Sequence, residues 1–477
     1  MENFEFVSPT HFVFGKGAEE QVGSKLAECG ARTVLLHFGG QSAVKSGLID
    51  RVKASLDAQG IKHVELGGVR PNPEITLARE GIALCKEHDV DWVLAVGGGS
   101  VIDSAKAIAV GAHYDGDVWD FFETKRPTDD VLPIAVVLTI PAAGSEASKN
   151  TVVSNDALQM KSGYANNAQR PKLAFMNPEL TFTLPPFQTA AGLTDMFCHL
   201  LERFFDDVGA VPVTDNLCLS LMKTVRAEAP RVVVDPENYD ARANVMWAGM
   251  LCHQGLAGVG RHEDWATHGL EHELSALYPE ITHGAGLAVM FPAWMEFVYD
   301  ANPARFAYYG REVFGLAPTG DVNADALSAI DETRSFFASL GMPITLAELD
   351  VEEDDIEKLI PTLKENKGEP SAASRSSPWT MPARSIGSRC NGACFCAARS
   401  YNRGEPQGAL TPHGSRIASA VWLLFLRLLV LADREPLHYC GQKTQQAGSE
   451  LKGVSREAFV PPAAERWRLP IENSLRR

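Results

Sequence analysis

The sequence lacks the features that mark secreted, membrane and nucleic-acid-binding proteins. Its first residues include neither a basic segment nor an apolar segment of the kind that begins a secretory signal. Its longest apolar stretch, Ile417–Ala432, contains Arg427 and is short for a membrane span. The formal net charge is −16, so there is no general excess of basic residues to attract nucleic acid or anionic lipid. We therefore expect no nucleic-acid partner and no membrane partner.

Paired cysteine spacings are also missing. The cysteines of the first 370 residues are scattered, and the cluster of Cys390, Cys394 and Cys396 is followed by no second CxxC or HxxxH that would complete a zinc site. Disulfide frameworks belong to oxidising compartments. The cysteine distribution therefore favours a reducing, cytoplasmic location.

The chain of 477 residues, 45% of them hydrophobic, is long enough for two or three domains with buried cores. Up to about residue 185, apolar strands alternate with helical stretches, which predicts a parallel sheet with crossover helices. The predicted strands are 3–16, 34–38, 61–66, 91–96 and 132–139. After the Leu184-Pro185-Pro186 break, long amphipathic stretches replace the strands. We predict an α/β domain over 1–185 and an all-helical domain over 186–370.

The segment 371–477 differs in composition from the rest. It is rich in Ser, Arg and Cys, and its basic residues outnumber its acidic ones, although the whole chain is acidic. One choice of codons, read one base earlier, would give an amphipathic helical ending followed by a stop. We interpret the segment as an atypical tail, the product of a frameshift, and expect it to be disordered.

Glycine clusters follow two of the predicted strands, although the GxGxxG fingerprint is absent. Gly97, Gly98, Gly99 and Ser100 open a helix, where backbone N–H groups and the helix dipole favour a pyrophosphate. The alternative is a simple flexible turn. No acidic residue to hold an adenosine ribose is present in the other cluster, 39–42. A 2′-phosphate, and therefore NADP, is allowed there.

Histidines and one aspartate recur at helical spacing between residues 195 and 283. Asp195 and His199 are four residues apart, as are His268 and His272, so each pair shares a helix face. With His283 beyond the second pair, one carboxylate and three imidazoles could bind Fe(II) or Zn(II). His272 could be a fifth ligand, a supporting residue or a proton-transfer group. A lone histidine is more often structural, and we interpret His253 and His262 that way because neither fits the spacing.

Several long motifs, in order, resemble those of a known family. They are GGGSVIDSAKAIA, PAAGSE, RPKLAFMNPELTFTLPP, AAGLTDMFCHLLE and DWATHGLEHELSALY with the HGAGLAVMFPAWM that follows. Over about residues 3–370 the chain resembles the iron-containing (group III) alcohol dehydrogenases, and more narrowly the NAD(P)H-dependent butanol dehydrogenases. The resemblance implies a dehydroquinate synthase-like architecture, with an α/β NAD(P)-binding domain, an all-helical metal-binding domain and an active site between them. It also implies a homodimer.

The resemblance assigns roles to individual residues. It implies that Asp195, His199, His268 and His283 bind one Fe(2+) or Zn(2+) ion, and that His272 lies near the nicotinamide. It implies cofactor contacts with NAD(P)(H) at Gly39, Gly40, Ser42, Asn72, Gly97, Gly98, Gly99, Ser100, Thr139, Ser148, Asn150, Lys161 and Leu180.

The expected reaction is hydride transfer between NAD(P)(H) and a small primary alcohol or aldehyde of the butanol or butanal type, with His272 as a candidate proton relay. The alternative on the same scaffold is a metal- and NAD-dependent lyase or cyclase related to dehydroquinate synthase. Such an enzyme needs many basic residues for a phosphorylated acidic substrate, whereas the helical motifs here are rich in Trp, Phe, Met and Leu. A third alternative, a non-catalytic binding protein, is disfavoured because all four ligands are present.

Overall fold

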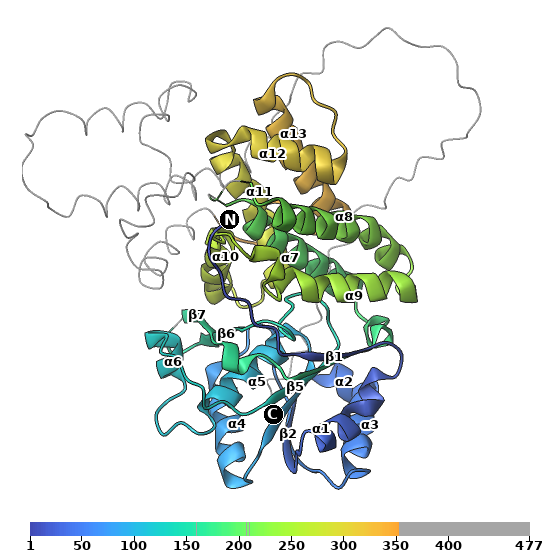
Figure 1. The fold of residues 1–477 in the computed structure, drawn as a ribbon, viewed down its shortest axis with the longest axis vertical. Helices are drawn as coiled ribbons and strands as arrows, with labels where there is room; N and C mark the ends of the chain where they lie inside the picture. The colour runs from blue at the N-terminus through green and yellow to red at the C-terminus, as the bar shows by residue number, and fades with distance from the viewer. Residues whose placement is uncertain (159, 207, 209, 353–477) are drawn as a thin grey trace, which may run out of the picture. The chain divides into compact units, whose positions relative to one another are not determined.

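The computed structural model describes residues 1–352 except 159, 207 and 209. The part of the chain before residue 186 is built on a six-stranded sheet (Figure 1). The strand order is β1-β8-β5-β4-β2-β3, and every pair of neighbours is parallel. The strands are β1 (His11–Phe14), β2 (Thr33–Phe38), β3 (Lys62–Leu66), β4 (Trp92–Gly97), β5 (Ile134–Leu138) and β8 (Leu173–Met176).

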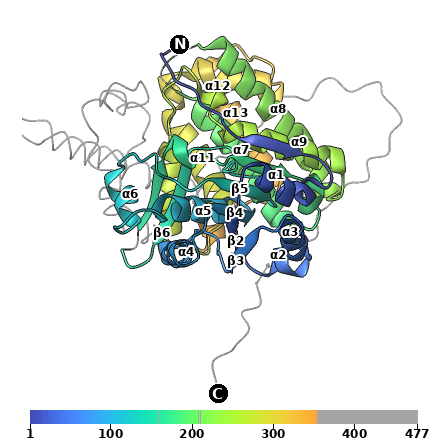
Figure 2. The same ribbon diagram turned by 60° about the horizontal axis from the view of Figure 1, so that its bottom comes forward.

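Alternate residues of the strands enter different apolar clusters on the two faces of the sheet. On β2, Val34 and Leu36 pack with helices α1 (Val22–Glu28) and α3 (Leu48–Asp57), whereas Leu35 packs on the opposite side. That opposite face is covered by α4 (Ile75–Glu87) and α5 (Gly99–Gly111), as Figure 2 shows. Burial on both faces explains why the inner strands β2, β4, β5 and β8 are almost continuously apolar.

Smaller elements complete this half of the chain. A separate antiparallel hairpin, β6 (Asn150–Asn155) and β7 (Met160–Ala165), contacts α5 through β6 and the helical half through β7. The remaining helical elements are η1 (Ala18–Gln21), α2 (Gln41–Lys45), α6 (Trp119–Thr124), η2 (Asn167–Gln169) and η3 (Pro178–Thr181).

From residue 186 onward the described chain contains helices and no strand. They are α7 (Pro186–Phe204), α8 (Pro212–Val234), α9 (Tyr239–His253), η4 (Leu256–Gly258), α10 (Ala266–Leu277), α11 (His283–Val298), η5 (Tyr299–Ala301), α12 (Pro303–Tyr309), η6 (Gly310–Phe314), α13 (Val322–Ser339) and η7 (Ala347–Leu349). Their buried side chains form one large apolar cluster in which α7 is central.

The predicted fold class is confirmed, with specific omissions. The sequence did not predict the hairpin of β6 and β7, strand β8, or helices α6, α11 and α12. The predicted tail, 371–477, and the stretch Ile417–Ala432 lie outside the described residues. No helix in the described part of the chain is both long and apolar enough to cross a bilayer.

His37 on β2 is a buried titratable group within the fold. Its Nδ1 lies 2.8 Å from the carbonyl oxygen of Leu66 and its Nε2 lies 2.8 Å from Oγ of Ser104. A neutral ring satisfies both partners, since Nδ1–H donates to the carbonyl and Nε2 accepts from the hydroxyl. Burial lowers the pKa of His37 from 6.5 to about 4.

This shift predicts a loss of stability in mild acid. The unfolded chain binds the His37 proton more readily than the folded chain, so the stabilisation present above pH 6.5 is lost as the pH falls towards 4. We expect His37 to lower the free energy of unfolding by about 2 kcal/mol between pH 7 and pH 5. Urea titrations at both pH values should show that His37→Leu removes this part of the pH dependence. The same pH dependence in both proteins would contradict the assignment.

Candidate functional site

A cavity of about 760 Å³ lies where three parallel strands end. Gly39 follows β2, Gly97 ends β4 and Thr139 follows β5, and all three line the cavity together with residues of α7, α10 and α11. Ligands of parallel α/β sheets bind at this edge. The predicted site residues that line it are Gly39, Gly40, Ser42, Asn72, Gly97, Gly98, Gly99, Ser100, Thr139, Ser148, Asn150, Lys161, Asp195, His199, His268, His272 and His283.

Leu180 is the predicted cofactor contact that does not line this cavity. It lies in η3 and packs, partly buried, against the apolar cluster of α1 and α3. The Leu180 side chain therefore packs into this apolar cluster and does not reach the cavity lining. A contact between Leu180 and the cofactor therefore stays a prediction without support from the geometry.

At the end of β4, neighbouring side chains lie so close to the backbone that only glycine fits there. A Cβ on Gly97 would lie 2.4 Å from Cγ2 of Val101, and a Cβ on Gly98 would lie 2.9 Å from Cβ of Ile140. Gly98 precedes α5, whose first turn therefore opens directly into the cavity. Backbone N–H groups at such a helix start can bind phosphate oxygens.

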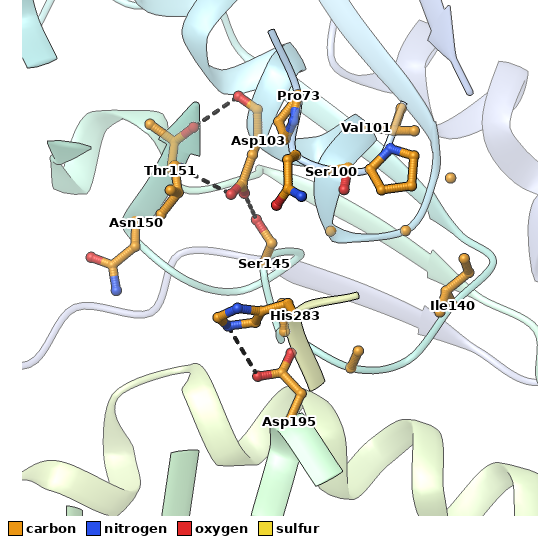
Figure 3. Close-up of a pocket in the computed structure, with 18 of the residues that line it drawn as sticks. Pro73, Ser100, Val101, Asp103, Ile140, Ser145, Asn150, Thr151, Asp195 and His283 are labelled. Carbon is orange, nitrogen blue, oxygen red and sulfur yellow. Dashed lines mark hydrogen bonds and ion pairs between the residues drawn. The ribbon is translucent and has the colours of Figure 1, made fainter. Parts of the chain in front are cut away.

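The loop after β5 is supported by a buried polar network centred on α5. Ser145 Oγ donates to Asp103 Oδ1 at 2.6 Å, and Thr151 and Val152 donate to Asp103 from β6, as Figure 3 shows in part. The Lys106 ammonium donates to Ser145 Oγ at 2.8 Å and to the Asn150 carbonyl at 2.7 Å. Burial lowers the pKa of Lys106 to about 8 and raises that of Asp103. This network fixes the cavity wall.

Asp195 is the centre of a cluster of potential metal ligands. Its Oδ1 lies 3.7 Å from Nδ1 of His199 on α7, and 3.7 Å from Nε2 of both His268 on α10 and His283 on α11. Figure 3 shows His283 facing Asp195 across the cavity. These separations are too long for hydrogen bonds. In the described structure Asp195 Oδ1, His199 Nδ1 and His268 Nε2 are buried with no hydrogen-bond partner.

Such an arrangement fits a divalent cation. Buried acceptors without partners are costly, and a cation between them would satisfy all of them together. A carboxylate with imidazole nitrogens is a donor set for Fe(II) or Zn(II). Burial, together with the neighbouring His253 and His268, holds the pKa of His199 well below its usual value, so its ring is neutral and can donate a lone pair.

Two buried glutamates orient the histidine rings. Glu202 Oε1 lies 2.9 Å from Nδ1 of His268, and Glu271 Oε2 contacts Nδ1 of His283. Each ring therefore presents Nε2 to Asp195. Although burial alone would raise the pKa of Glu271, His283 and Lys161 hold it at about 2, so the carboxylate is ionised. Carboxylate support of this kind fixes the tautomer of a metal-binding imidazole.

Glu271, His272 and His283 also lie close enough to suggest a second ligand group. The two groups share His283, whose Nδ1 contacts Glu271 and whose Nε2 faces Asp195. Glu271 thus acts on His283 from the side opposite Asp195. This geometry favours the group around Asp195 and leaves His272 beside it, with its ring centroid 5.6 Å from that of His283.

A close helix crossing brings His283 to the cluster. His283 is the first residue of α11, and a Cβ on Gly284 would lie only 2.2 Å from the carbonyl oxygen of Ala191 on α7. Only glycine allows the two helices to approach so closely. The sequence placed His283 only beyond the pair of His268 and His272; the structure shows it as the first residue of the next helix.

His253, interpreted from the sequence as structural, lines the cavity, so that interpretation was incomplete. Its ring centroid is 4.2 Å from that of His199, its Nε2 is 3.0 Å from the Asn150 side-chain amide, and its Nδ1 is 3.2 Å from the guanidinium of Arg203. Arg203 also donates to the carbonyl of His199 at 2.9 Å. Sequence analysis missed these supporting residues, together with Glu202 and Glu271. The sequence could have indicated Glu202 and Arg203, because both lie one helical turn after His199 on α7 and so share its face.

Asn72 and Lys161 line the cavity and also join the hairpin to α10. Lys161 Nζ donates to Asn72 Oδ1 at 2.9 Å and to Ser275 Oγ at 2.7 Å, and it lies 3.6 Å from Glu271. The Asn72 amide donates to the Pro279 carbonyl at 3.0 Å. Asn72 has φ +56°, a left-handed conformation that asparagine tolerates. Both residues are therefore positioned by contacts that cross from the α/β half to the helical half.

Comparison with known proteins identifies the family. The family model for iron-containing alcohol dehydrogenase matches residues 9–178, and the model for the C-terminal part of the Fe-containing alcohol dehydrogenase family matches residues 189–371. The chain is 41% identical over 358 residues to the probable NADH-dependent butanol dehydrogenase 2 of Bacillus subtilis, covering 75% of this chain and 91% of that protein. It is 35% identical over 370 residues to the NADPH-dependent aldehyde reductase YqhD of Escherichia coli, covering 77% and 94%.

A solved structure agrees with these matches. The crystal structure of NADH-dependent butanol dehydrogenase A from Thermotoga maritima superposes with a TM-score of 0.75 at 39% identity, covering 77% of this chain and 94% of that chain. Two family models that together span residues 9–371, relatives of about 40% identity and this common fold all agree. The chain therefore belongs to the iron-containing alcohol dehydrogenase family, in its butanol dehydrogenase-like branch.

Proposed function

We propose that this alcohol dehydrogenase interconverts small primary alcohols and aldehydes, of the butanol and butanal type, by hydride exchange with NAD(P)(H). The observation that carries the proposal is the convergence of Asp195, His199, His268 and His283 on one point beside the nucleotide-binding edge of the sheet. The named relatives are NADH-dependent butanol dehydrogenases and an NADPH-dependent aldehyde reductase, which supports the same reaction.

These four residues would hold one Fe(2+) or Zn(2+) ion; their nitrogen and oxygen donors suit either metal. When bound, the ion supplies Lewis-acid chemistry, which polarises a carbonyl or lowers the pKa of an alcohol. The chain itself positions this chemistry. Glu202 and Glu271 hold the imidazoles in one tautomer, and Trp265 adds an apolar wall to the cavity next to His199.

His272 is the residue we propose as the proton relay. It lines the cavity one helical turn after His268, beside His283 rather than facing Asp195. A group in this position can exchange a proton between the substrate oxygen and water. The proposed cofactor contacts are the cavity-lining glycines and polar residues named above, with the nicotinamide end towards His272.

The lyase or cyclase alternative is not favoured. Among the described residues, the cationic ones that line the cavity, apart from histidines, are Arg70, Lys125 and Lys161. Lys125 donates to Ser162 Oγ at 2.9 Å, and Lys161 is engaged by Asn72, Ser275 and Glu271. A phosphorylated polyacid would need more free cations near the metal ligands. The relatives are dehydrogenases and a reductase.

We also propose the domain division expected from the sequence, an NAD(P)-binding domain over 1–185 and a helical metal-binding domain over 186–370. The two family models, which match 9–178 and 189–371, support a boundary near 185. The frameshift origin of 371–477 remains a prediction. A cytoplasmic location is likewise proposed, supported by the five described cysteines, all of which are free thiols.

A homodimer formed through strand β1 is the proposed assembly. Among the described strands, β1 pairs only with β8, so one of its edges is open. The other edge strand, β3, carries Lys62 and Glu65, charges that discourage pairing, whereas β1 is HFVF. Phe14, 40% exposed, and Trp247, 39% exposed, lie with ring centroids 5.6 Å apart beside β1. Two copies related by a two-fold axis could pair these edges.

The proposed reaction can be tested with purified protein whose metal content has been measured. We expect butanal-dependent oxidation of NADPH or NADH, with activity lost on treatment with a chelator and restored by Fe(2+) or Zn(2+). Metal content by mass spectrometry should approach one ion per chain. Protein that holds one ion and binds nucleotide but reduces no aldehyde would contradict the proposed reaction.

His268 and His272 form a matched pair, one turn apart on α10. His268→Ala should lose both metal and activity, because even residues that support a metal ligand typically contribute about 10- to 100-fold in affinity. His272→Ala should keep the metal and lose turnover. Metal content and kcat measured together separate the two roles. A full metal complement in the His268 variant, or metal loss in the His272 variant, would reverse the assignments.

The dimer is tested by placing a charge on the open edge. Phe14→Glu should convert a dimeric wild-type protein to monomer in light scattering after size-exclusion chromatography, because a carboxylate would be buried at the paired edge. The matched control is Val234→Glu, at the 84% exposed end of α8, which should leave the dimer intact. A monomeric wild-type protein, or a dimer unaffected by Phe14→Glu, would contradict this interface.

A further inference from the structure

The charged residues of the cavity are unevenly distributed. The carboxylates that line it belong to Asp103 and Asp195. Asp195 lies in the ligand cluster, and Asp103 is turned inward towards Ser145 and Val152. The end of the cavity formed by β2, β3 and α2 is lined by residues without a carboxylate, namely Gly39, Gly40, Ser42, Ala43, Val69 and Arg70.

Arg70 supplies the positive charge at the end of the cavity formed by β2, β3 and α2. It follows β3, and its segment is tied to the end of β2 by hydrogen bonds from Gly68 N to the Gly39 carbonyl at 3.0 Å and from Val69 N to the Phe38 carbonyl at 3.4 Å. Val69 is buried in the core. The backbone that carries Arg70 is therefore fixed beside the Gly39–Gly40 turn.

The Arg70 side chain is exposed and makes no ion pair with any described residue. Arg51 on α3 and Arg79 on α4, in contrast, pair with Glu19 and Asp117. An exposed arginine commonly serves only solubility. What distinguishes Arg70 is that it lines a nucleotide-sized cavity at a place where no acid competes for its guanidinium.

Parallel α/β proteins distinguish the two nicotinamide dinucleotides at this position. An acidic residue after the second strand accepts hydrogen bonds from the free ribose diol of NAD, whereas a nearby arginine accommodates the 2′-phosphate of NADP. A guanidinium can bind a phosphate through two parallel hydrogen bonds. Gly40, where an added Cβ would meet nothing within 4 Å, leaves open space in which such a phosphate could lie.

We propose that Arg70 binds the 2′-phosphate of NADP(H) and makes the phosphorylated dinucleotide the preferred cofactor of this chain. The inference rests on the proposed function only in that the cavity binds a nicotinamide dinucleotide with its adenosine at the β2 end. Arg70 is thus a specificity-determining residue. Among the described residues, no hydrogen bond or ion pair joins Arg70 to the ligand cluster on α7, α10 and α11, so we expect it to act on cofactor affinity and not on the hydride-transfer step.

The experiment compares wild-type holoenzyme with Arg70→Gln, Arg70→Lys and a control, Lys62→Gln. The control removes one exposed positive charge from the opposite end of β3, outside the cavity. Binding is measured by calorimetry with adenosine 2′,5′-bisphosphate and with adenosine 5′-monophosphate, which differ only in the 2′-phosphate. Steady-state kinetics with butanal then give kcat and KM for NADPH and for NADH.

We expect wild-type protein to bind the bisphosphate more tightly than the monophosphate. Arg70→Gln should weaken bisphosphate binding and raise KM for NADPH by about 10- to 100-fold, the range for a charge-assisted hydrogen bond. Values for the monophosphate and NADH should change less than about twofold, and kcat should not change. Arg70→Lys should recover part of the loss, and Lys62→Gln should resemble the wild type.

Equal losses for both nucleotides in Arg70→Gln would overturn the proposal, since the guanidinium would then hold a phosphate common to both. An unchanged preference would overturn it as well. Failure of the proposed function looks different, because the protein would bind the nucleotides as predicted and show no aldehyde reduction with either cofactor. The calorimetric binding measurements therefore test the role of Arg70 even if the enzyme catalyses a different reaction.

Discussion

The structure depends on the electrostatic requirement created around Asp195. Three imidazole nitrogens face one buried carboxylate oxygen at 3.7 Å, which is too far for direct hydrogen bonds. A divalent cation bound between them would satisfy all four groups together. With a cation bound, the glutamates behind the rings of His268 and His283 would accept hydrogen bonds from Nδ1 and leave the Nε2 lone pairs pointing inward. Much of the helical half can be understood as the support that keeps α7, α10 and α11 in this arrangement.

This support consists of a few specific contacts, namely a close backbone approach and side-chain hydrogen bonds. Gly284 lets α11 approach the backbone of α7, and Arg203 links the carbonyl of His199 to the ring of His253 while its guanidinium lies 4.6 Å from the centroid of the Trp265 ring. Lys161 on the hairpin then connects α10 to the α/β half. The cluster and the nucleotide-binding edge are therefore positioned by one continuous set of contacts.

Periodicity in the sequence predicted the parallel sheet, the glycine turn after β4 and the paired faces of α7 and α10, because these are local patterns. It missed the β6–β7 hairpin, whose strands, NTVVSN and MKSGYA, contain few of the apolar residues that mark a buried strand. It could not pair Glu202 with His268 or Glu271 with His283, since helical spacing shows which residues share a face but not which residue of another helix lies opposite. His253 was misread for the same reason: its partners, His199, Asn150 and Arg203, are distant in sequence.

The two ends of the cavity differ in charge: Arg70 lines one end, and the carboxylate of Asp195 lies at the other. The chain carries a net charge of −16, so its overall field repels a dinucleotide that is itself anionic. At physiological ionic strength, however, charges more than about 8 Å away are largely screened, and local groups decide binding. The first turn of α5 can serve the pyrophosphate and Arg70 the ribose end, while the carboxylate of Asp195 remains with the ligand cluster. Among the residues that line the cavity, carboxylates are missing from the Arg70 end and present in the ligand cluster, so this distribution would favour the cofactor orientation proposed above, with the adenosine ribose at Arg70.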